Sequence, residues 1–587
     1  MPSFLRFLRR CTALAAALAF TACGGGSGVG ESGAAGDSAG GGATSGGQTT
    51  TTAGVTATPT SWLDAHRLAE QASFGPTEPL VRDISKSGPR KWIIDQMALP
   101  ASLGSRYTSG GGGDVHQYTV RDSDYCTGKG DTCWRENFSP ELLLRDFYTN
   151  AVTRPDQLRQ RMAFALQQLL VISGHDVSGT YGFRAYHNTL LNHAFANYRD
   201  LLRQVILSPV MGDFLNNANN DKLAPNENFA RELMQLFTIG VCELNADGTL
   251  KGGHCIPTYD NGTVRELAYA LTGWTYPSGG RTAWGCPVGL NCRYYGGSMV
   301  AAPAFHDTAP RKLLSGVSVP AGSTPDGALE SVLDSLMAHP NLAPFVARHL
   351  IQQLVVSNPA PTYVQNVAVA FTAGSYQGIG KGKKGDLAAT VAAVLLDPEA
   401  RRITVARKDG SLRQPVLMFT GLTRALRGRT DGQSFSWWWG ATLGQHVFMP
   451  PSVFNFFPPD YHVPGAALDL VGPAFGIHNA ATAINRMQFL NCMIYWNPCG
   501  EGTRNDLSGW VANYVAQGAP DRVLNPASPA DGTLVDALSK MAFGRSLPAD
   551  ERAAILQAMA VPWASPEYRV KTALFLIFAS PRYQIVH

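Results

Sequence analysis

The sequence predicts a mainly α-helical protein, with one large multi-helix globular domain that carries Gly-rich, disulfide-stapled loop insertions. Apolar residues recur at helical spacing over most of the chain, while the strict alternation typical of strands is scarce. Cysteines occur in close couples, two of which fall within Gly-rich stretches. Residues 59–587 are enough for a very large core or for two or more lobes.

The helical prediction rests on a series of segments with an apolar face. In residues 139–152, Leu143 and Phe147 are four apart and follow a Ser-Pro start that suits a helix N-terminus. A longer segment, 183–207, reads as one helix that ends before Pro209. The other predicted helices are 157–172, 226–239, 264–273, 328–338, 343–356, 387–396, 415–426, 476–495, 534–541, 549–559 and 568–579.

Residues 1–22 have the parts of an export signal. Three arginines precede a short apolar run at 12–20, which is too short to cross a bilayer and so indicates a signal peptide. Cys23 follows small residues and resembles the acylated cysteine of bacterial lipoproteins, although Phe20 stands where Leu is usual. We expect a lipid anchor on Cys23 in the membrane, with plain secretion as the alternative.

Residues 23–58 are expected to form the anchor and a tether. After Cys23 this stretch is almost entirely Gly, Ser, Ala and Thr, with only Glu31 and Asp37 charged. Such a composition cannot bury a core and behaves as a flexible coil, with a reach of roughly 30 Å. The expected product is an exported periplasmic or outer-membrane lipoprotein whose folded part spans 59–587.

Eight cysteines remain after Cys11, in the signal, and Cys23. None forms a CxxC pair, the spacing that zinc sites favour, so behind an export signal they predict four disulfides. Zinc binding and reactive thiols are the alternatives. Two couples lie in stretches that we expect to be surface insertions, 104–137 and 276–303. The couples are Cys126 with Cys133, Cys242 with Cys255, Cys286 with Cys292, and Cys492 with Cys499.

Charge and signature motifs narrow the possible functions. The formal charge of +4 falls to about +1 when the three signal arginines are removed, so no nucleic-acid partner is expected. The chain has no GxSxG, HExxH or GxxxxGK[ST] motif, nor a GxGxxG in a strand–helix context. Whether the protein is an enzyme is left open, no metal site is assigned, and any cofactor is unknown.

Residues 225–240 hold the densest group of candidate site residues. On a helix, Glu227 and Arg231 can pair, while Asn228 and Glu232 belong to a second polar stripe. Two carboxylates and an arginine this close are able to serve acid–base catalysis or metal binding. A capped amphipathic helix with internal ion pairs is the alternative, and the residues alone favour it. The preceding Asx-rich loop, 213–221, offers oxygen ligands for a cation, but turn formation is the simpler interpretation.

A second group is His306, Asp307 and Arg311, in a predicted loop. Histidine titrates near neutral pH, and the aspartate or arginine beside it could orient it or bind an anion. Neighbouring side chains usually diverge, which weakens this interpretation. A third group, the aromatic residues of 435–461, could stack on sugar rings or an apolar polymer, although aromatic zones more often pack a core.

These segments resemble a bacterial family catalogued as domain of unknown function 1800. The resemblance covers roughly residues 62–587. It implies a largely helical, often exported protein with no established activity. Members often accompany a second exported family, domain of unknown function 1501, which suggests a partner. Phe237 stands where many relatives have His, and Arg311 where they usually have Lys. The matching segments include 66–68, 73–77, 226–233, 264–266, 270–274, 305–307, 413–415, 443–445, 450–452 and 580–584.

Two functions fit these observations. The first is an anchored scaffold or binding protein that acts with a co-exported partner, and it predicts an exposed apolar or aromatic patch. The alternative is an envelope hydrolase acting on a glycan or other polymer. Its catalytic groups would be Glu227, Glu232, His306 and Asp307, with Asp307 orienting His306. Its substrate-binding groups would be Arg231, Asn228, Trp274 and Arg311.

Overall fold

The computed structural model describes most of residues 55–586. The predicted signal peptide, Cys23, the tether and the couples Cys126 with Cys133 and Cys286 with Cys292 lie outside the described residues. The chain divides into units 1–50 and 51–587, and the second is described here. Within it, none of the described helices is long and apolar enough to span a bilayer. The ranges left out of 55–586 are 104–126, 131–140, 178–179, 278–293, 404–409, 466–469, 497–498, 500–501, 519–528 and 562–563.

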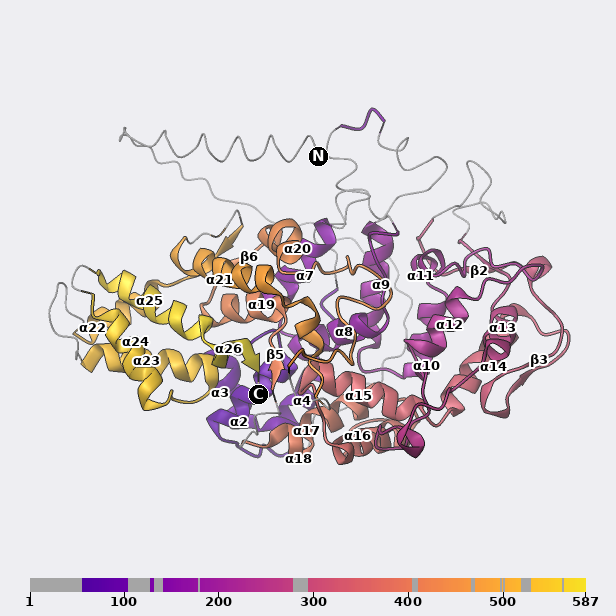
Figure 1. Cartoon of the computed structure of the whole chain (residues 1–587), viewed down its shortest axis with the longest axis horizontal. Helices are drawn as coiled ribbons and strands as arrows, with labels where there is room; N and C mark the ends of the chain where they lie inside the picture. The colour runs from indigo at the N-terminus through magenta and orange to yellow at the C-terminus, as the bar shows by residue number, and fades with distance from the viewer. Residues whose placement is uncertain are drawn as a thin grey trace, which may run out of the picture. The chain divides into compact units, whose positions relative to one another are not determined.

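The mainly α-helical fold is confirmed, and the strands that the structure describes are short antiparallel pairs (Figure 1). The helices are α2 (Trp62–Ala72), α3 (Glu78–Ser87), α4 (Pro89–Ala98), α7 (Glu141–Thr153), α8 (Gln157–Leu169), α9 (Thr180–His193), α10 (Tyr198–Ile206), α11 (Pro209–Phe214), α12 (Asn228–Gln235), α13 (Asn261–Ala270), α14 (Pro325–Ala338), α15 (Leu342–Leu354), α16 (Pro361–Ala373), α17 (Leu387–Leu396), α18 (Pro398–Arg401), α19 (Pro415–Ala425), α20 (Gly440–Thr442), α21 (Ala480–Tyr495), α22 (Ser508–Ala516), α23 (Pro529–Phe543), α24 (Ala549–Met559), α25 (Pro566–Ala579) and α26 (Pro581–Gln584). The strand pairs are β1 (Trp274–Thr275) with β2 (Val300–Ala301), β3 (Arg311–Lys312) with β4 (Ser318–Val319), β5 (Ser411–Leu412) with β8 (Ile585–Val586), and β6 (Arg429–Thr430) with β7 (Thr503–Arg504).

Many helices begin at a capping side chain that the sequence supplies. Asp260 accepts a hydrogen bond from the Thr263 backbone N–H at 2.8 Å, and Asp386 accepts one from Ala389 at 2.9 Å. These bonds satisfy amide donors that have no partner inside the helix. Proline occupies the first turn of α14, α16, α19 and α25, where its missing N–H costs no hydrogen bond.

The single helix predicted over 183–207 is wrong, because the chain forms α9 and α10 with a break between them. At the break Asn197 is extended, and its side-chain oxygen accepts from the Arg199 N–H at 2.9 Å, which caps α10. Its amide also donates to the Lys384 carbonyl at 2.9 Å. The helix therefore ends where a contact with a distant segment replaces the helical hydrogen bonds.

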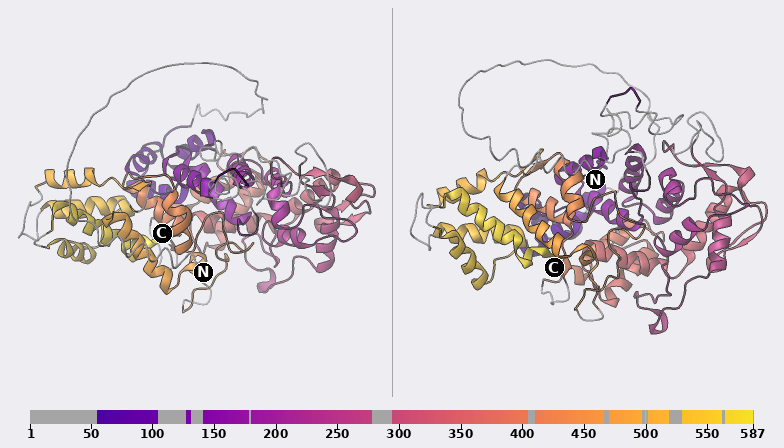
Figure 2. Two further views of the ribbon diagram at one scale, coloured as in Figure 1. Left: turned by 90° about the horizontal axis from the view of Figure 1, so that it is seen from above. Right: turned by 45° about the horizontal axis from the view of Figure 1, so that its top comes forward.

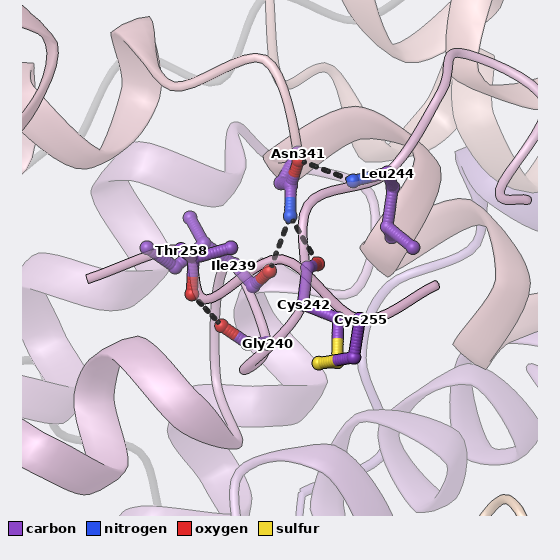
Figure 3. The surroundings of a disulfide bond; sticks show 7 residues. All are labelled: Ile239, Gly240, Cys242, Leu244, Cys255, Thr258 and Asn341. Carbon is purple, nitrogen blue, oxygen red and sulfur yellow. Dashed lines mark hydrogen bonds between the residues drawn. A yellow bond between two sulfur atoms is a disulfide. The ribbon is translucent and has the colours of Figure 1, made fainter. Parts of the chain in front are cut away.

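Two of the four predicted disulfides are present among the described cysteines. Cys242 joins Cys255 with a Cα–Cα distance of 4.9 Å, and Cys492 joins Cys499 with 5.2 Å. Figure 3 shows how the first loop is fixed further: the buried Asn341 amide donates to the carbonyls of Ile239 and Cys242, at 3.0 and 2.8 Å. The disulfide loop is thus attached to the start of α15.

Most of the described aromatic zone packs in the core, as the simpler interpretation predicted. Phe435 and Phe448 are buried, and the Phe448 ring lies edge-on to Phe147 at 6.0 Å. Phe419 stacks on Phe435 and links α19 to the same cluster. Trp438 and Phe454, in contrast, are exposed.

The two ends of the folded unit meet. β5 pairs with β8, the last strand, and the buried Arg413 binds Glu70 of α2 at 2.7 Å and the Tyr583 carbonyl at 2.9 Å. His66 of α2 lies 2.8 Å from the Met541 carbonyl in α23. These contacts join the first described helices to the C-terminal ones, whose positions can be followed in Figures 1 and 2.

Candidate functional site

Helix α12 carries the first group of candidate residues. Glu227 precedes its first turn and pairs with Arg231 through an N–O distance of 3.2 Å, as the spacing predicted. Both side chains are more than a third exposed, at 39% and 38%, so this ion pair contributes little stability. Asn228, also exposed, donates from its amide to the Asn216 side chain at 3.2 Å. The surface of the helix is therefore held by short-range pairs.

Glu232 lies on the inner side of α12, not on the polar stripe that the sequence suggested. It is buried, and its Oε2 has no hydrogen-bond partner among the described residues. Burial raises the pKa of Glu232, with Arg231 acting in the opposite direction. Tyr259 is close enough that Glu232, after burial, helps to raise the pKa of its phenol. This carboxyl is thus shifted toward its protonated form.

The Asx-rich loop before α12 links three segments. The Asn219 backbone N–H donates to the Trp274 carbonyl at 2.7 Å, and its side-chain oxygen accepts from the Thr275 hydroxyl at 2.7 Å. The Asn220 side chain accepts from the Asn226 N–H at 2.7 Å. Because these bonds use the loop's oxygens, the turn interpretation suits the geometry better than a cation site. Among the described residues, no cluster of His, Cys, Asp and Glu has the arrangement of a metal site.

His306 is buried and bound to the end of α13. Its Nδ1 lies 2.9 Å from the Thr272 carbonyl, so the ring proton resides on Nδ1. Its Nε2 is buried and has no partner in the described part of the chain. Gly273, with a positive φ of 83°, lies against the histidine backbone, where a side chain would collide. His306 is therefore oriented by Thr272 and not by Asp307.

Asp307 and Arg311 form a separate network. The Asp307 carboxylate accepts from Arg311 at 2.7 Å, and Arg311 also reaches Glu266 of α13 at 3.2 Å. The guanidinium lies 3.8 Å from the centre of the Tyr269 ring. The hydrogen bond that Arg311 donates to Asp307 contributes most to the raised pKa of Arg311. With two carboxylates and a ring already bound, Arg311 is poorly placed to take a substrate anion.

The structure brings the predicted residues into one region but not into one catalytic group. The Asx-rich loop connects α12 to Trp274 in β1, and Lys222, directly after that loop, donates its backbone N–H to the Phe305 carbonyl at 3.1 Å. No hydrogen bond or ion pair between Glu232 and His306 exists within the described ranges. The buried Trp274 has no partner for its Nε1 among those residues. Glu266 binds Arg311 and Thr272 orients His306, but neither residue was predicted as a site residue. The only sequence signal for them was that both lie in segments that resemble the family.

The family described as Protein of unknown function (DUF1800) matches residues 67–585. The chain belongs to this family. No curated protein and no solved structure matches the chain. The DUF1800 match covers nearly all of the described unit, so the disulfide loops, the candidate residues and the meeting of the two ends all belong to the family domain.

This DUF1800 chain also exposes an uncharged helix face that was not among the candidate sites predicted from the sequence. We call the α21 face the outward positions Ala481, Ile484, Gln488 and Asn491, together with Trp496 directly after the helix. Ile484 is 60% exposed and Trp496 72%. The helix carries one charged residue, Arg486, and that side chain is buried against Gln584 and the Arg413 carbonyl. The α21 face is therefore uncharged, and the Cys492–Cys499 disulfide closes the loop that presents Trp496.

Proposed function

We propose that this protein is an envelope-anchored binding or scaffold protein that acts through a co-exported partner protein. The observation that carries the proposal is the α21 face, an uncharged helix surface with two exposed large apolar side chains. Single exposed apolar residues are ordinary, but depletion of charge together with an exposed tryptophan matches the composition of interface cores. Tryptophan is also among the residues that contribute most to binding energy at protein interfaces.

The state of the candidate catalytic residues supports the same proposal. Glu227, Asp307 and Arg311 are already paired inside the chain. Enzymatic acid–base groups need to reach a substrate and one another within hydrogen-bond distance. The Glu227–Arg231 pair lies at the surface of α12, while the Asp307–Arg311–Glu266 contacts connect the loop to α13, which is the behaviour of a polar network that fixes a fold.

The proposed location is the cell envelope. The leader, Cys23 and the Gly/Ser/Thr-rich stretch support an exported periplasmic or outer-membrane lipoprotein, with secretion as the alternative. A lipidated cysteine followed by a coil of this composition would hold the folded unit away from the membrane and let it reorient. Such an arrangement suits a protein that must meet a partner near the same surface.

The α21 face is tested by binding measurements with the full-length lipidated chain. The partner is the exported protein of the family catalogued as domain of unknown function 1501 from the same genome. We expect I484K and W496K each to weaken the complex at least tenfold, because each places a charge in a desolvated contact. V369K is the matched control, since Val369 is 59% exposed on α16. Equal affinity of I484K, W496K and the native chain would reject the proposal.

One observation favours the alternative, an envelope hydrolase acting on a glycan or other polymer. Glu232 has a raised pKa and a free Oε2, and His306 has a free Nε2 among the described residues. A protonated carboxyl is suited to general acid catalysis. If this function holds, E232Q loses at least 100-fold in polymer cleavage while keeping its fold and its partner affinity. An unchanged cleavage rate in E232Q would remove Glu232 from any mechanism.

A further inference from the structure

A cavity of about 380 Å³ lies among α2, the start of α3, the end of α19, α22 and α23. Its volume is in the usual range for small-ligand sites, about 300–1,000 Å³. None of its lining residues belongs to the α21 face or to the α12 and His306 groups. It lies beside the segment 73–77, so a family motif forms part of its border. The residues used below are Trp62, Thr77, Arg427, Trp510, Asn513 and Lys540.

The lining is strongly positive, with four basic side chains and a single carboxylate, that of Glu78. Glu78 is shared between Arg82, its partner four residues away, and Arg427, whose nearest nitrogen is 3.9 Å distant. Arg424 donates to the carbonyls of Gly75 and Val152, which carry no net charge. One carboxylate thus faces several cations, and the cavity attracts anions.

Lys540 is the cation that stands nearest to an aromatic wall. Its ammonium lies 4.7 Å from the centre of the Trp62 ring and forms no ion pair with any described carboxylate. The side chain is exposed at the rim, so its charge is available to a ligand that enters the cavity. A cation fixed over an indole is well placed to meet an anionic group attached to a ring.

The uncharged residues that line the cavity indicate which kind of anion it would bind. Trp510 offers an apolar ring face, on which the CH side of a sugar ring packs, while Lys540 lies over the ring of Trp62. The Asn513 amide and the Thr77 hydroxyl can exchange hydrogen bonds with hydroxyl groups. Aromatic faces, hydroxyl-binding groups and an excess of cations together match a saccharide that carries carboxylates. A plain inorganic anion would use only the cations.

We propose that this cavity binds an acidic oligosaccharide, with a uronate-type ring against tryptophan and its carboxylate facing Lys540 and Arg427. The site goes beyond the proposed partner surface and shares no lining residue with it. A saccharide site would let the same anchored protein hold a partner and an anionic envelope or environmental polymer.

The test uses the full-length chain and isothermal titration with tetragalacturonate, with maltotetraose as the neutral probe. We expect saturable binding of the acidic probe only, weakened at high salt because the contacts are charged. K540E and R427E should each weaken binding at least tenfold, and W510A likewise. K383E is the control, since Lys383 is an exposed lysine in a turn that does not line the cavity.

Three results would overturn the proposal: no saturable binding of tetragalacturonate, equal binding of maltotetraose, or native affinity in both K540E and R427E. Both charge variants change exposed side chains, so their folding is checked by comparing melting temperatures with that of K383E. Native partner affinity in I484K and W496K together with weakened saccharide binding in K540E and R427E would show a failure of the proposed function alone, and the opposite pattern would show a failure of this site alone.

Discussion

At the residue scale, Gly273 packs so closely against His306 that the candidate site leaves no room for a side chain at this position. It has a φ of +83°, and a Cβ built there would lie 2.6 Å from the His306 Cβ. We expect G273A to combine the left-handed penalty with a steric clash and to cost at least about 3 kcal/mol of unfolding free energy. G382A is the control, because Gly382 has a φ of +71° and nothing within 4 Å of its Cβ position. It should lose only about 1–2 kcal/mol. Equal losses in urea denaturation would contradict the close packing on His306.

Glu232 gives a pH-dependent prediction at the same scale. Burial raises its folded-state pKa, so its ionisation is harder in the folded chain than in the unfolded chain. Its contribution to stability is full below the unfolded pKa, about 4.3, and is lost as the pH rises through the folded pKa. We therefore expect E232Q to melt at a higher temperature than the native chain at neutral pH and at the same temperature near pH 4. A lower melting temperature for E232Q at neutral pH would contradict this.

Side-chain pairs within one helix could be predicted from the sequence. Side-chain pairs between distant segments could not. Glu227 and Arg231 are four apart, and their contact follows from helix geometry alone. Arg311 uses Glu266, which is 45 residues away, and no spacing rule connects the two. The tautomer of His306 depends on the Thr272 carbonyl for the same reason.

At the element scale, the Cys242–Cys255 loop should stabilise the region after α12. Its cysteines are 13 residues apart, and the chain-entropy model gives such a closure about 3 kcal/mol. We expect replacement of both cysteines by Ser to lower the unfolding free energy by about this amount. The Cys492–Cys499 pair, 7 apart, serves as comparison and should be worth about 2 kcal/mol. No loss on removal of Cys242–Cys255 would mean that the Asn341 hydrogen bonds alone hold the loop.

The sequence periodicity predicted the presence of most helices, but it often did not predict the residues at which they end. The range predicted for 387–396 coincides with α17, whose N-cap Asp386 and apolar run are local features. The break between α9 and α10 comes from the hydrogen bonds of Asn197 to Lys384 and of Tyr198 to Gly385, which periodicity does not reveal. Helices α2 to α4, α16 and α22 were missed, since their apolar spacing was not recognised between turn-forming residues.

At the scale of the whole molecule, Arg413 joins the two ends of the family domain. It binds Glu70 at 2.7 Å and the Tyr583 carbonyl at 2.9 Å, and both charged side chains are buried. We expect R413A to cost about 3–5 kcal/mol, because it leaves the Glu70 carboxylate buried without its partner. The double variant E70Q/R413M should recover part of the loss. A native-like melting temperature for R413A would show that the ends are held by other contacts.

We propose that the residues of the family signature hold the fold, while exposed surfaces do the binding. The most direct test measures the affinity of the full-length lipidated chain for its co-exported partner in the native protein, E232Q and W496K. We expect native affinity for E232Q and at least tenfold weaker binding for W496K, with all three chains folded. Native affinity in W496K together with lost binding in E232Q would contradict it, because the signature and not the α21 face would then carry the interaction.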